Sequence, residues 1–171
     1  MWFNKFRTTY DEKEVWLMEI AAKTKEREQS IYIIKPEGWM NHRITIRSKI
    51  RRCGLTIVDS AQVPIPKWAV EKLSLGLPED LRQFIRNHLF GRMCEVGIVE
   101  GDGAIKKLLE ICGESYNPNE CAPGTIRREF APRMPHWTGK RTYWLNVIHQ
   151  PKDEEEAARD LELILKLLPK K

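Results

Sequence analysis

Short runs of β-branched and aromatic residues recur along the chain, and between them apolar residues return every three or four positions. Val, Ile, Tyr and Trp pack well on a pleated surface, so such runs predict strands that are largely buried. The predicted strands cover residues 31–34, 55–58, 93–99 and 143–149.

The stretches between these strands carry the periodicity of amphipathic helices. Helices are predicted over residues 11–28, 41–53, 67–75, 78–90 and 102–112, and in a C-terminal stretch that follows Asp153. The acidic start of the last helix suits the positive end of its dipole. Its predicted apolar face comprises Leu161, Ile164, Leu165 and Leu168.

Arg43, Arg47 and Arg51 form a basic stripe on the helix predicted over 41–53, away from its apolar face. Two interpretations are open: a surface that binds anions, or a solvated helix face, which is the commoner situation for such a stripe.

The order strand, helix, strand, helices, strand, helix, strand predicts an α+β fold, a ferredoxin-like βαββαβ sandwich. In that plan helices cover a four-stranded antiparallel sheet. The same fold supports many functions, so function has to be argued from the site.

Composition narrows the class of protein. The 171 residues are 31% charged and 42% hydrophobic, as expected for a globular chain with one full core. No apolar run approaches the roughly 20 residues that span a bilayer, and the N-terminus lacks a secretory signal pattern. We therefore expect no membrane association and a cytoplasmic location.

The cysteines and the net charge do little to narrow the function. Cys53, Cys94, Cys112 and Cys121 show no Cys-x-x-Cys spacing, so free thiols are expected rather than a zinc site. A net charge of +5 suits polyanionic partners, but it does not distinguish nucleotides from nucleic acid.

Four segments carry candidate chemistry, one of which is the polar turn Gly113-Glu114-Ser115-Tyr116-Asn117-Pro118. Lys35 follows the first strand, and Gly38 is expected to let the chain turn sharply. Residues 123–127 form a Pro-Gly-Thr-Ile-Arg loop that delivers Arg127, whose guanidinium suits bidentate phosphate binding. His149 ends the last predicted strand, where an imidazole can act as base, metal ligand or nucleophile. Taken singly, each residue is more often structural.

Together, these segments resemble the nucleoside diphosphate kinase family. The matching stretches, in order, are Tyr32 to Gly38, Val99-Glu100-Gly101, Gly113 to Pro118, Pro123 to Arg127, and Asn146 to His149. The resemblance covers roughly residues 30–166.

The resemblance implies a phosphotransferase of nucleotide metabolism with a ping-pong mechanism. His149 would accept the γ-phosphate of ATP or another nucleoside triphosphate, and the phosphohistidine would pass it to a nucleoside diphosphate. Lys35 and Arg127 would contact phosphate, and Asn146 would orient the sugar hydroxyl and the phosphate. Mg²⁺ would bridge the nucleotide phosphates, with Asp153 holding its waters.

Further nucleotide contacts follow from family motifs. Arg82 and Phe84 have the spacing with which the family binds phosphate and stacks the base, although Phe84 also fits the apolar face of its helix. Ser115 replaces a family threonine. A family arginine falls on Leu109, so Lys106 or Lys107 would have to replace it.

Two further departures flank the histidine. Gln150-Pro151-Lys152 replaces the Gly-Ser that follows the histidine in the family. The family's acidic partner for the histidine is expected near Leu161, and Asp160, the nearest carboxylate, is expected on a different helix face.

Residues 1–29 are predicted to be a helical extension, and residues 30–171 the kinase-like domain with an insert at about 131–144. The insert is expected to be a lid or a subunit contact, or else a surface loop packed by its own aromatic residues. Family members are usually hexamers, so a homo-oligomer is implied.

Three functions remain open: an active kinase, a catalytically weak member that serves as a nucleotide-binding or interaction module, and a nucleic-acid-binding protein. The last has no recognised motif in its support and is not expected.

Overall fold

The computed structural model describes residues 27–170. The predicted extension at 1–29 and its helix over 11–28 lie almost wholly outside these residues. Arg27 and Glu28 are described and are not helical.

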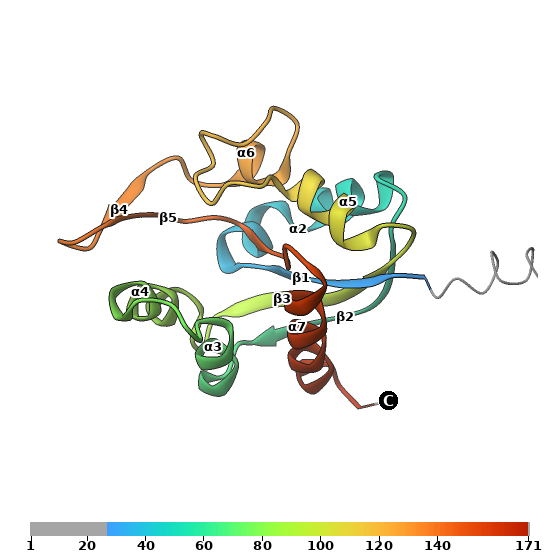
Figure 1. Ribbon diagram of the computed structural model, residues 1–171, viewed down its shortest axis with the longest axis horizontal. Helices are drawn as coiled ribbons and strands as arrows, with labels where there is room; N and C mark the ends of the chain where they lie inside the picture. The colour runs from blue at the N-terminus through green and yellow to red at the C-terminus, as the bar shows by residue number, and fades with distance from the viewer. Residues whose placement is uncertain (1–26, 171) are drawn as a thin grey trace, which may run out of the picture.

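A four-stranded antiparallel sheet forms the centre of the molecule (Figure 1). The strand order is β2-β3-β1-β6, and every neighbouring pair is antiparallel. The strands are β1 (Gln29–Ile34), β2 (Thr56–Pro64), β3 (Met93–Glu100) and β6 (Ile148–His149). This topology confirms the predicted ferredoxin-like α+β sandwich.

Helices cover both faces of the sheet, with α2, α5 and α6 on one side and α3, α4 and α7 on the other (Figure 1). Their bounds are α2 (Pro36–Arg52), α3 (Lys67–Leu73), α4 (Glu79–Leu89), α5 (Ala104–Cys112), α6 (Ile126–Phe130) and α7 (Glu154–Leu167). The predicted helices within the described residues are confirmed, with shifted ends.

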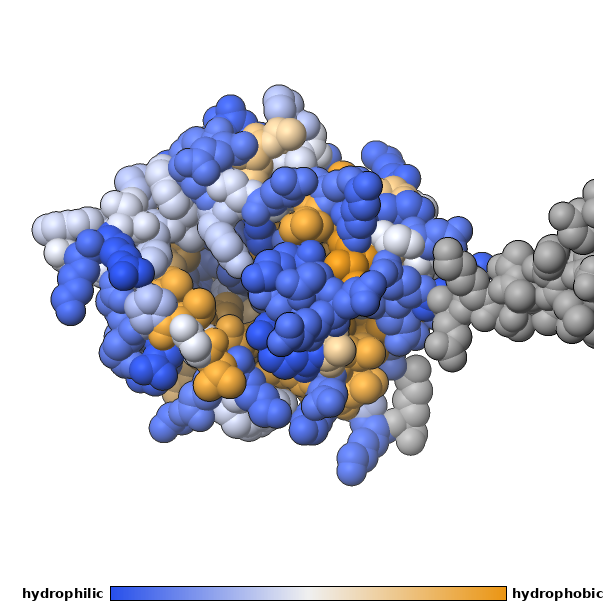
Figure 2. All heavy atoms as spheres, viewed as in Figure 1, coloured by the Kyte–Doolittle hydropathy of each residue, from blue (hydrophilic) through white to orange (hydrophobic). Residues whose placement is uncertain are grey.

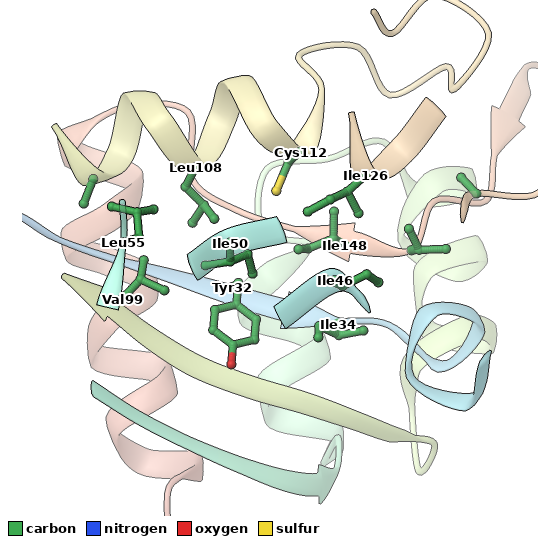
Figure 3. Packing of buried hydrophobic residues seen from close by; sticks show 13 residues of the cluster. Tyr32, Ile34, Ile46, Ile50, Leu55, Val99, Leu108, Cys112, Ile126 and Ile148 are labelled. Carbon is green, nitrogen blue, oxygen red and sulfur yellow. The ribbon is translucent and has the colours of Figure 1, made fainter. Parts of the chain in front are cut away.

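Each face of the sheet has its own core, because successive residues of a strand point to opposite faces. Figure 3 shows Tyr32 and Ile34 of β1 packed beneath Ile46 and Ile50 of α2, with Ile148 beside Ile126. On the other face Ile31 and Ile33 pack with the α7 residues Leu163 and Ile164.

The Tyr32 ring packs directly against the backbone of Gly97 in this core. A Cβ atom at Gly97 would lie 2.5 Å from the Tyr32 ring, so only glycine leaves room there. The Tyr32 hydroxyl donates to Glu95 at 2.7 Å, and Arg43 and Arg47 also pair with this carboxylate. Glu95 is only 1% exposed. Two arginines of the predicted stripe are therefore part of a buried polar network, and only Arg51 matches the solvated interpretation.

Three sequence predictions about secondary structure are wrong in detail. Helix α2 begins at Pro36 rather than at residue 41, because proline fits the first turn of a helix. Residues 113–142, over which no helix or strand is predicted, contain α6 and most of a hairpin of β4 (Pro135–Trp137) and β5 (Thr142–Trp144). The predicted strand 143–149 divides between β5 and β6, so only Ile148 and His149 join the main sheet.

The apolar face of α7 also differs from the prediction. Its buried residues are Ala157, Asp160, Leu163 and Ile164, whereas Leu165 is exposed. The face that packs on the sheet is thus rotated, and it includes one carboxylate.

Candidate active site

The ends of β1 and β6 bring Lys35 and His149 to one edge of the sheet. In the β1–β6 ladder, Ile33 pairs with His149 and Ile34 with Ile148. The Lys35 backbone N–H then donates to the Val147 carbonyl at 2.9 Å. Because Ile148 points into the core beneath α2, its neighbour His149 points to the opposite face, toward α7.

Asp160 of α7 orients the imidazole. Its Oδ2 lies 2.8 Å from Nε2 of His149, and its Oδ1 accepts from Nε of Arg159 at 2.9 Å. The carboxylate is 1% exposed, and its burial raises its pKa, but the hydrogen bonds and positive partners outweigh this effect and hold the pKa below its usual value. An ionised carboxylate accepts, so Nε2 carries the proton and Nδ1 keeps the lone pair.

The acidic partner of His149 is expected near Leu161, with Asp160 on a different helix face. The contact between His149 and Asp160 shows that this expectation is wrong. Asp160 is itself on the buried face of α7 because that face is rotated. The histidine side chain keeps 23% of its surface exposed, so its free nitrogen has access to a substrate.

Arg127 is almost fully buried, at 2% exposure, and ties together the chain around the histidine. Its Nη1 donates to the Gly113 carbonyl at 2.7 Å and the Ser115 carbonyl at 3.2 Å. Its Nη2 donates to the Ile148 carbonyl at 3.3 Å and to Oε1 of Gln150 at 2.9 Å. Gln150, which replaces a residue of the family pattern, thus helps to hold the Arg127 guanidinium in place.

Two polar atoms beside the histidine are buried without a partner among the described residues: Nε of Arg127 and Oδ1 of Asn146. A buried polar atom without a partner is costly, and such atoms mark places where a ligand or water completes the hydrogen bonding. Asn146 is 5% exposed and precedes the histidine by three residues.

Lys35 is half-buried, and desolvation, together with the nearby charge of Arg127, lowers the pKa of its ammonium to about 8. Two cations close together without a full set of anions favour the arrival of an anionic group. The site is therefore suited to a phosphate.

Gly38 has a different role from the sharp turn expected from the sequence. It lies in the first turn of α2 with an ordinary helical backbone. A Cβ atom there would lie 2.8 Å from the Val147 carbonyl oxygen and 3.0 Å from Cβ of Val147. Glycine is required because α2 approaches the segment before His149 so closely.

The residues predicted on α4 are engaged elsewhere. Arg82 pairs with Glu79 of the same helix, while its Nε is buried without a partner in the described chain. Phe84 stacks on His88 at 4.7 Å between ring centroids and also meets Tyr143 and His136 of the hairpin. No recorded hydrogen bond or ring contact within residues 27–170 joins either residue to His149.

Ser115 and Asp153 have local partners. The Ser115 hydroxyl donates to Glu120 at 2.7 Å and accepts from the Asn117 amide at 3.1 Å. Asp153 caps α7 by accepting from the Glu156 amide at 2.8 Å. Their roles toward phosphate and metal stay predictions.

Neither lysine proposed as a substitute for the family arginine is directed toward the histidine by any recorded contact. Lys106 is exposed and pairs with Glu110 at 3.9 Å. The ammonium of Lys107 lies 3.9 Å from the position of a Cβ at Gly54, near the end of α2. Leu109 therefore has no evident replacement.

The fold and the site fit one class: an α+β sandwich in which a carboxylate-oriented histidine lies at the same edge of the sheet as Lys35 and Arg127, an arrangement that suits phosphoryl transfer through a histidine. The sequence model of the family "Nucleoside diphosphate kinase" matches residues 28–168. The chain belongs to the nucleoside diphosphate kinase family, whose members are phosphotransferases.

Individual relatives agree with this assignment. A nucleoside diphosphate kinase of Halorhodospira halophila is 31% identical over 144 residues, which cover 81% of this chain and 93% of the relative. One from Listeria innocua is 32% identical over 142 residues, covering 80% and 87%.

Solved structures share the fold. A transition-state mimic of the Borrelia burgdorferi nucleoside diphosphate kinase with vanadate and ADP matches with a TM-score of 0.65 and 21% identity, covering 80% of this chain and 85% of that one. An NDP kinase from Pyrobaculum aerophilum matches with a TM-score of 0.67 and 16% identity, covering 80% and 94%.

Proposed function

We propose that the chain transfers the γ-phosphate of a nucleoside triphosphate to a nucleoside diphosphate through a phosphohistidine at His149. The observation that carries this proposal is the 2.8 Å contact between Nε2 of His149 and the buried Asp160. It leaves Nδ1 as the nucleophilic nitrogen and places a negative charge where the ring becomes cationic during attack.

In the first half-reaction, the lone pair of Nδ1 forms a bond to the γ-phosphorus, and the bond from that phosphorus to the bridging β–γ oxygen breaks. The nucleoside diphosphate leaves with those electrons. In the second half-reaction, a terminal oxygen of another nucleoside diphosphate attacks the phosphohistidine, and the bond to Nδ1 breaks. Each step exchanges one bond for another, so no further reactant is needed.

The neighbouring residues take the roles that their chemistry suits. Lys35 and Arg127 neutralise the transferred phosphoryl group and its neighbour, Lys35 through its ammonium and Arg127 through the unpartnered Nε. Asn146 accepts a hydrogen bond through Oδ1, for which a sugar hydroxyl is a suitable donor. Arg82, Phe84 and Ser115 are proposed for the outer part of the nucleotide.

Mg²⁺ is proposed as the metal and would be held mainly by nucleotide oxygens. Within residues 27–170, no three His, Cys, Asp or Glu side chains gather closely enough to hold an ion. This fits a metal carried in on phosphates, because Mg²⁺ keeps several waters and prefers phosphate oxygens to an all-protein cage. Asp153 would have to contribute through water, through the oxygen that does not cap α7.

A homo-oligomer, with a hexamer as the family precedent, is proposed as the working state. β2 is an edge strand that pairs only with β3 in the described chain, and Val58 on it is 42% exposed. Hydrophobic residues also form separate patches on the visible surface (Figure 2). Trp137, 77% exposed on the hairpin, is a further candidate contact because tryptophan is favoured at interfaces.

No helix in the described part of the chain combines the length and hydropathy needed to cross a membrane. Arg43 and Arg47 are paired with Glu95, so of the basic stripe only Arg51 lies outside this buried network.

The experiment is incubation of purified protein with γ-labelled ATP and Mg²⁺. We expect a protein label that is stable in base and labile in acid, and that His149→Ala abolishes. Nucleotide binding without a label in folded wild-type protein would instead support the catalytically weak alternative.

A further inference from the structure

The β4–β5 hairpin covers the aromatic ring that the proposed function assigns to the nucleobase. Tyr143 lies 5.5 Å from Phe84 between ring centroids, inclined by 31°, and His136 lies 5.6 Å away. His88, on the same helix as Phe84, lies 4.7 Å away and inclined by 29°. Phe84 therefore contacts rings from two elements: His88 of its own helix is stacked on it, and Tyr143 and His136 of the hairpin are tilted against it.

A base cannot enter between Phe84 and the rings that contact it. His88 stacks on Phe84 from its own helix, and Tyr143 contacts the same ring from the hairpin. Two aromatic rings whose centroids lie roughly 4.5–7 Å apart are in direct contact, with no room for a third ring between them. The 5.5 Å spacing between Phe84 and Tyr143 is too narrow.

A polar contact holds the hairpin in this position. The Tyr143 hydroxyl donates to Oδ2 of Asp80 at 2.9 Å, and Oγ1 of Thr138 lies 3.5 Å from the same oxygen. Asp80 lies in the first turn of α4, four residues before Phe84. The hydrogen bond and the ring contact thus fasten one hairpin to one helix at two neighbouring points.

We infer that the β4–β5 hairpin is a gate over the nucleobase position, held shut by the Tyr143–Asp80 hydrogen bond. The inference rests on the proposed function, since it assumes that the base stacks on Phe84. A nucleotide binds only to molecules in which the hairpin has moved away from Phe84, so its apparent affinity is reduced by the fraction that is open. A triphosphate without a base does not need this opening.

The test compares ATP with inorganic triphosphate in variants that weaken the hydrogen bond. Tyr143→Phe removes the hydroxyl and keeps the ring, and Asp80→Asn removes the charge of the acceptor. Thr142→Val is a matched control, because Thr142 is exposed on the same strand and is not part of the contact. The readouts are the ATP concentration that half-saturates His149 labelling, the maximal labelling rate, and inhibition of labelling by inorganic triphosphate.

For Tyr143→Phe and Asp80→Asn we expect half-saturating ATP to fall by about three- to tenfold, the range for loss of one ordinary hydrogen bond. The maximal labelling rate and the inhibition constant of inorganic triphosphate stay as in the wild type. Unchanged or higher half-saturating ATP would overturn the gate, as would an equal shift for inorganic triphosphate. Melting curves verify that each variant is folded.

Failure of the gate can be told from failure of the proposed function. If the wild type acquires no label, phosphotransfer through His149 is refuted, and the same variants are compared by calorimetric binding of ADP and of inorganic triphosphate. Tighter ADP binding with unchanged triphosphate binding then still supports the gate. Labelled wild type with variants that do not shift refutes the gate alone.

Discussion

Asp160 accepts a hydrogen bond from Nε2 of His149 across 2.8 Å, although the two residues come from a helix and a strand on opposite sides of a loop. The carboxylate is buried, and it is shared with Arg159. Because the bond fixes the proton on Nε2, it directs nucleophilic reactivity to Nδ1. A purely structural histidine has no need of a free Nδ1, so the orientation of this ring supports the proposed role of His149.

Asp160→Asn is expected to slow the labelling of His149 by γ-labelled ATP by about 10- to 100-fold. The amide can still accept a hydrogen bond, but the negative charge that stabilises the cationic ring is lost, at a cost of about 1.5–3 kcal/mol. Glu162→Gln is the control, because it makes the same charge change at an exposed position of α7. Equal rates in wild type and Asp160→Asn would show that the carboxylate has no role in transfer.

Nucleotide affinity is expected to fall as pH rises above about 8, the pKa to which burial and Arg127 lower Lys35. Only the charged ammonium attracts phosphate, and the pKa is depressed in the free protein, so the attraction is complete well below pH 8 and is lost as the pH rises through this value. Calorimetric titration of ADP between about pH 7 and pH 10 measures this loss.

Lys35→Arg provides the comparison for that titration, because a guanidinium stays charged over the whole range. Its affinity for ADP is expected to change little with pH. If wild type and Lys35→Arg lose affinity in parallel, another group is responsible for the pH dependence.

Gly38→Ala is expected to lower the free energy of unfolding by about 1–3 kcal/mol, as for other overpacked positions. The new methyl group would meet the Val147 carbonyl oxygen at 2.8 Å, and α2 cannot move without straining the Lys35–Val147 hydrogen bond. Urea unfolding measures the change. Asn41→Ala, exposed on the same helix, should lie within about 0.5 kcal/mol of wild type. A Gly38→Ala protein as stable as wild type would contradict the close approach.

Glu95→Ala is expected to destabilise the protein by about 3–5 kcal/mol, because it leaves Arg43, Arg47 and the Tyr32 hydroxyl without their shared acceptor. Urea unfolding again gives the value, with Arg51→Ala as the exposed control of the same stripe. Folded Glu95→Ala protein should still label, since Glu95 and His149 side chains are on opposite faces of the sheet. A loss below about 1 kcal/mol would show that the network contributes little.

The fold was predictable because its information is local. Strand runs and helical periodicity depend on neighbouring residues, and they located all but the short elements. The sequence does not reveal the hairpin, because strands of three residues are too short to carry a periodic signal. The start of α2 is not predicted, because Lys-Pro-Glu-Gly is typical of a turn. Proline at the first helical position also begins helices, as it does here.

The sequence points to the motif residues of the proposed site and not to their partners. Lys35, Arg127, Asn146 and His149 lie in distinctive stretches, and the structure places these stretches at one edge of the sheet, while the roles of the four residues stay predictions. Their hydrogen-bond partners lie elsewhere in the sequence: Gln150 accepts from Arg127, and Asp160 contacts His149. These pairings depend on the rotation of α7 and the path of the loop, which no spacing rule fixes. The covering of Phe84 by Tyr143 likewise required the folded hairpin.

The central claim, that His149 carries the phosphoryl group between two nucleotides, is tested most directly by labelling and chase. Wild-type protein is first labelled with γ-labelled ATP and freed of nucleotide, and unlabelled GDP is then added. We predict that the label leaves His149 and appears in GTP, and that His149→Ala neither takes up nor transfers label. Label that stays on the protein after GDP addition, or that is carried by His149→Ala, would contradict the account.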